Sequence, residues 1–497
     1  MLDIVFVSIP FSNLDQIYPA PAILKGVAIE NGYTARTRDF GCDLLNLCGR
    51  NVSLFNSVQT YFYPAPAEFE HADIIEQFYQ DCITWLRDNP ARFIGISVMS
   101  VQQHRCAIDL MARIKAENVP GIVVAGGPGV AEPVLATTKR VIDIKPTEKF
   151  LKFGQILKKR KLVDHIVVGD GEDAVLQILS TNSAPEEKVF SEQFKSPVPD
   201  FEDYNFNHYL FEDGVYLPVT GSKGCVRDCD FCTIRNHYGK YRYRSGADIA
   251  NEMIDLNSKH GVRKFQFTDS LVNGGLKPFR EFLSVLADFN SNNPDRSITW
   301  TGQYIARPPG QMPDDYYPLI AQSGGHGITI GADHGSDRVL EYMGKKTNVA
   351  GLFYELEMFR KYNITCQLLF MGHWSEQWED FLINCKTLIK LAPYVRSGTI
   401  SAIQMGIPMI FIDGSPSVDN LEKNNIIVSD FDPQNIYYFQ NDPESTFREK
   451  AYRTIIMHRI AKELKLPAIR GVENLTWISH IISDRTDKIN DFYDQFE

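Results

Sequence analysis

The sequence contains no run of about 18 consecutive apolar residues, and this absence predicts that no helix spans a membrane. It begins MLDIVFVSIP, which lacks the basic lead and the long apolar stretch of a secretory signal. Positive charge is also scarce, because 51 lysines and arginines face 62 aspartates and glutamates, for a formal net charge of −11 at pH 7. Since nucleic-acid binding requires a basic surface, we expect no nucleic-acid partner. The absence of a long apolar run and of a secretory signal leads us to expect a cytoplasmic protein without a membrane partner.

The cysteines are nine, an odd number that does not fit a fully paired disulfide framework. Clustered cysteines in a long chain without a secretory signal bind metal or take part in chemistry. The 497 residues are 44% hydrophobic and 23% charged, which is enough for more than one buried core. We therefore expect a globular protein of several domains from a reducing compartment.

Short apolar runs alternate with helix-compatible stretches through the first third of the chain. This alternation predicts an α/β fold with a doubly wound, parallel, Rossmann-like sheet over residues 1–189. Ligands of such sheets bind beyond the carboxyl ends of the strands, where small residues allow a close approach. The predicted strands are Leu2–Val7, Thr34–Phe40, Phe93–Met99, Gly121–Gly127 and Asp164–Val168. The small residues near these ends are Ser97, Ser100, Gly126, Gly127, Gly169 and Gly171.

A second alternation of strands and helices follows. Residues 190–212 are rich in proline and acidic residues and predict a linker, whereas residues 213–410 repeat strand and helix six times. Six such units predict a partial (β/α)6 barrel of the TIM type, whose active site lies at the carboxyl ends of its strands. Residues 411–497 predict a mostly helical cap with a helix over Ser445–Leu464. The predicted barrel strands are Val215–Thr220, Lys264–Thr268, Ile298–Tyr304, Gly327–Ala332, Thr365–Met371 and Thr399–Met405.

Three cysteines lie in one loop directly after the first predicted barrel strand. Cys225, Cys229 and Cys232 have C-x3-C-x2-C spacing, and thiolates are soft ligands suited to iron–sulfur clusters or zinc. Three ligands can hold three irons of a cubane cluster and leave the fourth iron open. A structural zinc site needs a fourth ligand, which His237 could supply.

This motif, with the aromatic Phe231 before its last cysteine, resembles that of the radical S-adenosylmethionine (radical SAM) superfamily. The resemblance implies that the three cysteines hold a 4Fe–4S cluster whose open iron binds S-adenosylmethionine (SAM). One electron, from a donor such as flavodoxin or ferredoxin, would then split SAM into methionine and a 5′-deoxyadenosyl radical. The protein would supply binding, orientation and exclusion of water.

Further segments of the barrel are similar to radical SAM proteins in order along the chain. Tyr241–Leu256, Phe265–Gly274 and Ile328–Lys346 resemble the first helix, the second strand, and the fourth strand with its helix. The family often has Gly-x-Pro-Gly-Glu where this chain has a loop at His373, so this loop is expected to be specialised for the substrate. No catalytic base is evident. The resemblance implies contacts to SAM from Phe231, Asp269, Gln303, Arg307, Asp333 and Ser336.

The first third is similar to the cobalamin-binding-type domain that precedes many radical SAM barrels. The resemblance is carried by Ile4–Pro10, Val123–Pro133 and Val163–Leu179, and it implies that cobalamin contacts the small residues at the strand ends. Many cobalamin domains place a histidine under cobalt in an Asp-x-His-x-x-Gly motif. Here Asp39-Phe40-Gly41 has no such histidine.

Three functional hypotheses result. The first is a cobalamin-dependent radical SAM enzyme that methylates an unactivated carbon of a small-molecule or peptide substrate. The second is a radical SAM enzyme that carries out a rearrangement, cyclisation or oxidation without bound cobalamin. The third is a non-catalytic iron–sulfur redox or sensor protein, which would need no SAM site.

Overall fold

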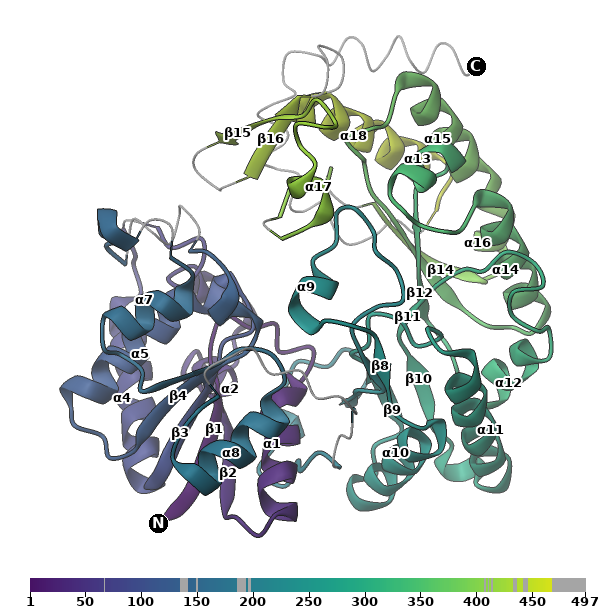
Figure 1. The fold of residues 1–497 in the computed structure, drawn as a ribbon. Helices are drawn as coiled ribbons and strands as arrows, with labels where there is room; N and C mark the ends of the chain where they lie inside the picture. The colour runs from purple at the N-terminus through teal and green to yellow at the C-terminus, as the bar shows by residue number, and fades with distance from the viewer. Residues whose placement is uncertain are drawn as a thin grey trace. The chain divides into compact units, whose positions relative to one another are not determined.

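The chain forms two compact units, which divide between Pro218 and Val219, and each is described by itself (Figure 1). The structure is a computed structural model. It describes residues 1–66, 68–134, 142–148, 151–185, 194, 198–405, 408–409, 411–412, 414–431, 436–440 and 446–466. The end of the predicted cap, beyond residue 466, lies outside this range. No helix in the described ranges is both long and apolar enough to cross a membrane.

The first unit contains one sheet of five parallel strands in the order β2-β1-β3-β4-β5. The strands are β1 (Leu2–Ser8), β2 (Ala35–Asp39), β3 (Ala91–Ser97), β4 (Ile122–Gly126) and β5 (His165–Val167). The order confirms the predicted doubly wound sheet. Since β2 lies on one side of β1 and β3 lies on the other, the switch point of the sheet falls between β1 and β3. Ligands of open α/β sheets bind at this point.

Helices cover both faces of this sheet (Figure 1). On one face, α1 (Pro19–Glu30) and α8 (Gly171–Thr181) pack side by side, and their apolar residues share a core with the sheet. Phe6 and Phe93 lie in this core with Ile178. The other helices of the unit are α2 (Phe40–Leu47), α3 (Val52–Gln59), α4 (Ala72–Asp88), α5 (His104–Ala116) and α7 (Phe153–Lys159).

The described part of the predicted linker packs onto the first unit. Lys25 is 4% exposed and pairs with Asp200 at 3.0 Å and Asp203 at 2.6 Å. The Tyr209 hydroxyl donates to the Asp39 carboxylate at 2.8 Å. These contacts attach residues 200–209 to the middle of α1 and to the end of β2. The predicted domain boundaries stay predictions.

The second unit contains two parallel sheets in the orders β6-β9-β10 and β11-β12-β13-β14. Together they occupy six strand positions and confirm the predicted partial barrel. The third predicted strand is divided at Gly302, where a Cβ would lie 2.6 Å from the Val272 side chain. The strands are β6 (Tyr216–Val219), β9 (Lys264–Phe267), β10 (Thr299–Thr301), β11 (Gln303–Tyr304), β12 (Ile328–Asp333), β13 (Cys366–Phe370) and β14 (Ile400–Met405).

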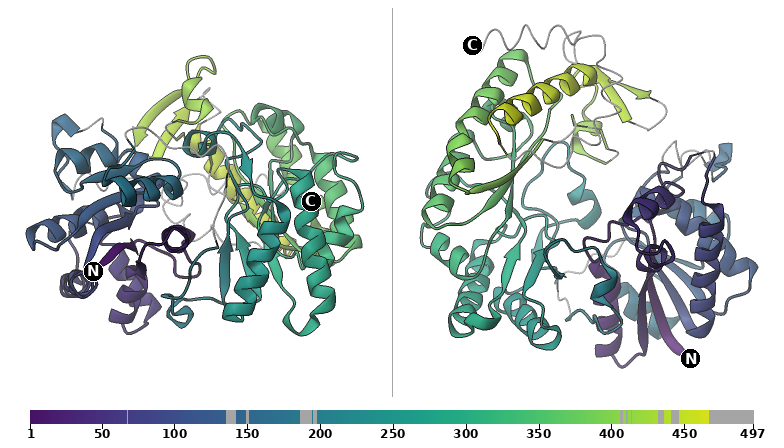
Figure 2. Two further views of the ribbon diagram at one scale, coloured as in Figure 1. Left: turned by 60° about the horizontal axis from the view of Figure 1, so that its bottom comes forward. Right: turned by 180° about the vertical axis from the view of Figure 1, so that it is seen from behind.

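Helices lie on the outer side of these strands, as the two further views show (Figure 2). The strand face toward the helices is buried and apolar: Ile330 pairs with Leu368, which pairs with Ile403. The opposite face carries Gln303 and Gln367, and Gln303 is exposed. The helices are α10 (Gly246–His260), α11 (Leu276–Asn292), α12 (Tyr316–Gln322), α13 (Asp337–Tyr342), α14 (Val349–Lys361), α15 (Trp378–Lys390) and α16 (Ala392–Arg396).

Beyond β14, the described residues form a short helix, a hairpin and a long helix. The hairpin pairs β15 (Ile427–Phe431) with β16 (Ile436–Gln440) in antiparallel fashion and was not expected from the sequence. Helix α18 (Phe447–Glu463) confirms the helix predicted at Ser445–Leu464, and Thr446 caps it by accepting from the Glu449 N–H. It packs against α15 and β14. The short helix is α17 (Pro416–Asp419).

Candidate iron–sulfur and cofactor site

The three motif cysteines lie in the loop that leaves the first barrel strand. The loop follows the short β7 (Ser222–Lys223), which pairs with β8 (Arg242–Tyr243), and continues into α9 (Ile234–Tyr238). Cys229 is buried, whereas Cys225 and Cys232 are half-buried, and all nine cysteines are free thiols. The Arg227 N–H donates to the Cys225 sulfur at 3.4 Å. Soft thiolates that accept backbone hydrogen bonds fit an iron–sulfur cluster.

A lysine supplies positive charge beside these thiols. Burial raises the pKa of Cys229 to about 12, and the charge of Lys345 partly offsets this rise. Lys345 forms an ion pair with Asp333 and lies 5.5 Å from the centre of the Phe231 ring. A nearby cation favours the thiolate form, which is the form that binds metal. Burial and this charge therefore act on the Cys229 thiol in opposite directions, and the rise of the pKa from burial is the larger effect.

The sequence left a zinc site with His237 as the fourth ligand as an alternative to a cluster. In the part of the chain that the structure describes, no three side chains of histidine, cysteine, aspartate or glutamate converge on one point as ligands of one ion would. A structural zinc site requires such convergence of four ligands. In a cubane cluster each thiolate binds a different iron, so the three sulfurs need not converge. The alternative with His237 as a fourth zinc ligand stays a prediction.

Asp269, at the end of β9, fixes the start of the cysteine loop. Its carboxylate is 4% exposed and accepts hydrogen bonds from the Gly221 N–H at 2.8 Å and from the Ser222 hydroxyl at 2.5 Å. Burial raises the pKa of Asp269 to about 7, and the hydrogen bond from Ser222 opposes that rise. The hydrogen-bond donors to Asp269 are therefore a backbone N–H and a hydroxyl group of the loop that leads to Cys225.

Three other predicted SAM contacts surround the same end of the barrel. Gln303 is exposed on the inner strand face. Asp333 has a φ of +57° at a β-bulge and pairs with Lys345. The Ser336 hydroxyl donates to Asp380 at 2.6 Å, so its visible role is to hold α15. Contacts of these residues with SAM stay predictions.

Arg307 is held by a buried carboxylate on α14. Its N–H donates to Glu355 at 3.0 Å, and its guanidinium donates to the Asn273 carbonyl oxygen at 2.7 Å. Glu355 is fully buried and also accepts from the Tyr304 hydroxyl at 3.2 Å. Burial raises the pKa of Glu355 from its ordinary value of 4.5 to about 7. The segment that carries Arg307 therefore depends on a carboxyl group that titrates near neutrality.

Replacing Glu355 by glutamine is expected to flatten the dependence of stability on pH. Because the folded-state pKa is raised, the folded state binds this proton more tightly than the unfolded state does. Its stabilisation is complete below pH 4.5 and is lost as the pH rises through about 7. The whole effect is at most about 3 kcal/mol. Urea unfolding between pH 5 and 8 measures it, and equal slopes for wild type and Glu355→Gln would contradict the expectation.

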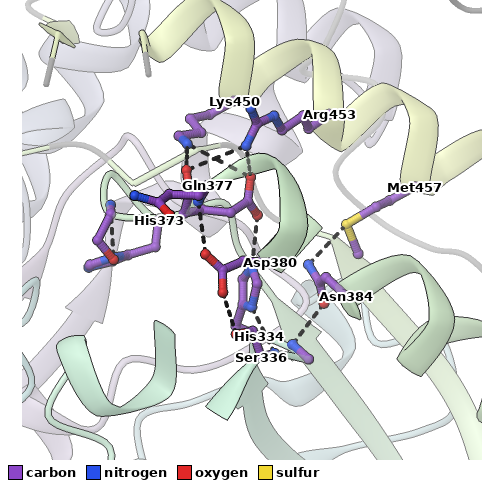
Figure 3. A network of polar contacts seen from close by, with 12 residues as sticks. His334, Ser336, His373, Gln377, Asp380, Asn384, Lys450, Arg453 and Met457 are labelled. Atoms are coloured by element: carbon purple, nitrogen blue, oxygen red, sulfur yellow. Dashed lines mark hydrogen bonds and ion pairs between the residues drawn. The ribbon is translucent and has the colours of Figure 1, made fainter. Parts of the chain in front are cut away.

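A buried charge network joins the ends of β12, α15 and α18 (Figure 3). His334 Nε2 lies 2.7 Å from Glu376, and the His334 Nδ1 accepts the Ser336 N–H at 3.0 Å. Arg453 donates to Glu376 at 2.9 Å, and Lys450 donates to its backbone oxygen. All four charged or titratable side chains are at least nine-tenths buried. The buried partner of the His334 ring is therefore the Glu376 carboxylate.

In the first unit, three small residues, two of them predicted, form a row across the carboxyl edge of the sheet. Ser97 pairs with Ser8 on one side and with Gly126 on the other. This row lies at the switch point between β1 and β3, where ligands of such sheets bind. Gln103 ties the neighbouring loops together, because its amide donates to the Ile9 and Phe11 carbonyl oxygens. The sequence indicated Ser97 and Gly126 but missed Ser8 and Gln103, whose places depend on strand order.

The other predicted cobalamin contacts have visible structural roles. Gly127 has a φ of +103°, and a Cβ there would lie 2.4 Å from the Val98 carbonyl oxygen. Gly169 has a φ of +100°, and Gly171 begins α8. Ser100 precedes the 3-10 turn that leads into α5. Contacts with cobalamin stay predictions for all six residues.

Asp39 and His104 both have structural partners in this unit. Asp39 accepts from the Gly41 N–H at 2.9 Å as well as from Tyr209. His104 is fully buried, stacks on Phe153 at 3.8 Å and lies 2.9 Å from the Gly129 carbonyl oxygen through Nε2. These contacts give His104 a structural role.

The fold and the site define an α/β protein in which a doubly wound sheet precedes a six-strand partial barrel with a three-cysteine loop. Residues 219–384 match the Radical SAM superfamily. The chain therefore carries a radical SAM domain, and the resemblance predicted from its cysteine motif is confirmed.

Two solved structures share this fold over most of the chain. The radical SAM methyltransferase TsrM from Kitasatospora setae, with tryptophan and a SAM analogue bound, has a TM-score of 0.60 at 14% identity and covers 87% of this chain and 79% of its own. The cobalamin-dependent SAM radical enzyme OxsB, with aqua-cobalamin bound, has a TM-score of 0.61 at 13% identity and covers 88% of this chain and 64% of its own.

Curated relatives match shorter stretches. The cytidylyl-2-hydroxyethylphosphonate methyltransferase of Streptomyces wedmorensis is 26% identical over 33% of this chain and 31% of its own. The anaerobic magnesium-protoporphyrin IX monomethyl ester cyclase of Synechocystis sp. is 23% identical over 48% of this chain and 52% of its own. The chain thus spans about a third and about half of the length of these two relatives.

Proposed function

We propose that this protein is a cobalamin-dependent radical SAM enzyme. The observation that carries the proposal is the loop of three free cysteines after the first strand of a six-strand barrel, within residues 219–384 that match the Radical SAM superfamily. Cys225, Cys229 and Cys232 would hold a 4Fe–4S cluster. When bound and reduced, such a cluster supplies the electron that splits SAM into methionine and a 5′-deoxyadenosyl radical.

The protein's own residues would position the reactants. Asp269 holds the start of the cysteine loop through Gly221 and Ser222. Lys345, paired with Asp333, keeps a positive charge beside the thiols. Gln303 faces the inner side of the barrel, where its amide is available to a bound ligand. The electron would come from an external donor such as flavodoxin or ferredoxin in the cytoplasm, where free thiols persist.

Cobalamin would bind the first unit at the carboxyl edge of its sheet. The row of Ser8, Ser97 and Gly126 lies at the switch point, and the small side chains leave room for a large ligand. Ser12 supports this assignment, because its hydroxyl is buried near Gly41 and has no hydrogen-bond partner in the described structure. The fold shared with TsrM and OxsB, whose structures hold cobalamin, supports it further. The reaction would be methylation of an unactivated carbon in a small-molecule or peptide substrate.

The test uses the full chain, reconstituted anaerobically with iron, sulfide and hydroxocobalamin. Reduction with dithionite in the presence of SAM is expected to yield 5′-deoxyadenosine and methionine, measured by mass spectrometry. The protein is also expected to retain cobalamin through gel filtration, which its absorption spectrum reports. Protein with a full cluster that gives neither product would contradict radical SAM chemistry and favour a redox or sensor role. Protein that makes both products without retaining cobalamin would overturn only the cobalamin assignment.

A second candidate is a radical SAM reaction without methyl transfer. The similarity to the magnesium-protoporphyrin ester cyclase, which extends over 48% of this chain, favours it. SAM with a labelled methyl group separates the two candidates. Label in the product supports methylation, whereas unlabelled product with stoichiometric 5′-deoxyadenosine supports the second candidate.

A further inference from the structure

The loop that follows β13 contacts the cysteine motif directly. Two side chains of this loop donate to the carboxylate of Asp230, the residue next to Cys229. His373 Nε2 lies 3.0 Å and Trp374 Nε1 lies 3.1 Å from Asp230 Oδ2. His373 is fully buried, and its Nδ1 accepts the Ser375 N–H at 3.2 Å. Because Nδ1 is an acceptor, the proton of a neutral ring is assigned to Nε2, where it points at Asp230.

The backbone of Asp230 is held as well. Its N–H donates to the Met343 carbonyl oxygen at 3.1 Å, and its own carbonyl oxygen accepts from the Ser417 N–H at 2.8 Å. Asp230 therefore takes part in four hydrogen bonds with three segments that are distant from it in sequence. This number of partners is large for one residue of an irregular loop, whose backbone groups are ordinarily solvated.

The next residue, Phe231, is packed on two sides. It contacts one apolar cluster that includes Trp374 and another that includes Leu340 and Met343. Asp230 and Phe231 form the dipeptide between Cys229 and Cys232, so the separation of these two sulfurs depends on how this dipeptide is held. Charge-assisted hydrogen bonds to a carboxylate are stronger than those between neutral groups. The His373–Trp374 contact is thus suited to fix the two sulfurs.

We propose that His373 and Trp374 are positioning residues for the cluster: they hold Asp230 so that Cys229 and Cys232 keep a fixed spacing. The proposal rests on the proposed function of the three cysteines as cluster ligands. The loop at His373 would thus support the metal ligands, whereas the sequence had predicted that this loop is specialised for the substrate. Partners of metal ligands set affinity and reduction potential even though they do not touch the metal.

Four variants of the full chain separate these contacts. His373→Asn keeps an acceptor for Ser375 but is too short to reach Asp230, whereas His373→Gln keeps a donor at the position of Nε2. Trp374→Phe keeps the packed ring and removes its N–H donor. Trp378→Phe is the matched control, because Trp378 is an exposed tryptophan of the following helix, with Arg453 beside its ring. Circular dichroism and thermal unfolding report whether each variant folds.

The first measurement uses metal-free protein and the rate at which iodoacetamide alkylates Cys229, followed by peptide mass spectrometry. His373→Asn and Trp374→Phe are expected to raise this rate about tenfold, because each loses a hydrogen bond to a charged group. His373→Gln and Trp378→Phe are expected to match wild type. Wild-type rates in folded Trp374→Phe and His373→Asn would overturn the proposal. If His373→Asn fails to fold, Trp374→Phe decides alone.

The second measurement uses protein reconstituted with iron and sulfide. The loss of iron to a chelator is expected to be about tenfold faster in His373→Asn and Trp374→Phe, with a shifted midpoint potential of the cluster. A role in folding alone would lower thermal stability without moving the potential. Wild-type protein that takes up no iron would overturn the proposed function. A loaded wild type with unchanged variants would overturn this inference only.

Discussion

Replacing Cys225 by alanine is expected to abolish the reductive cleavage of SAM. A cubane cluster held by three thiolates on one loop loses a bound iron when one of them is removed. The yield of 5′-deoxyadenosine should therefore fall to that of the sample without protein, and the iron content should fall well below that of wild type. Iron and sulfide analysis together with product quantification by mass spectrometry measure both quantities.

Cys385→Ala is the matched control for this result. Cys385 lies on α15, is fully buried, and burial raises the pKa of its thiol to about 12, so it is an unreactive packing residue. We expect this variant to keep the iron content and the product yield of wild type. A Cys225→Ala protein with wild-type iron and wild-type product would show that the motif does not hold the cluster.

Replacing Glu376 by alanine is expected to cost about 3–5 kcal/mol in the free energy of unfolding. The substitution leaves Lys450 and Arg453 buried without the carboxylate that faces them, and the Nε2 of His334 loses its partner at 2.7 Å. Removing one partner of a buried ion pair exposes the full cost of burying the other charge. Urea unfolding at pH 7, followed by circular dichroism, gives the difference.

Glu379→Ala is the control for this prediction. Glu379 lies three residues along the chain in the first turn of α15 and is exposed, so its removal is expected to change stability by less than about 0.5 kcal/mol. Equal stabilities for Glu376→Ala and Glu379→Ala would contradict the view that the network shown in Figure 3 holds α18 on the barrel.

Much of the fold could be predicted because its signals are local. The alternation of apolar runs with amphipathic stretches predicted eleven strands. Ten of them correspond to single parallel strands of the structure, and the remaining one is divided into β10 and β11. That strand is divided at Gly302, which packs against Val272 beyond the end of the neighbouring strand β9, a contact that no sequence window contains. The β15–β16 hairpin was missed because its segment was assigned to a helical cap on the strength of α18 alone.

The candidate site, like the fold, has a part that the sequence predicts and a part that it does not. The spacing of Cys225, Cys229 and Cys232 by itself determined that this loop suits a soft metal, since the three ligands lie within eight residues of chain. Only the tertiary structure decided which residues support that loop. Asp230 and His373 are 143 positions apart and meet because parallel strands bring their carboxyl ends to one edge of the barrel.

The same physical reason applies to the first unit. The sequence alone indicated small residues at the ends of strands, because turns and close approach require them. That Ser97 lies between Ser8 and Gly126 follows from the strand order β2-β1-β3-β4-β5, which is set by packing between distant segments. Neighbouring residues determine which ligand a short motif suits, whereas contacts between distant segments determine the partners of each side chain.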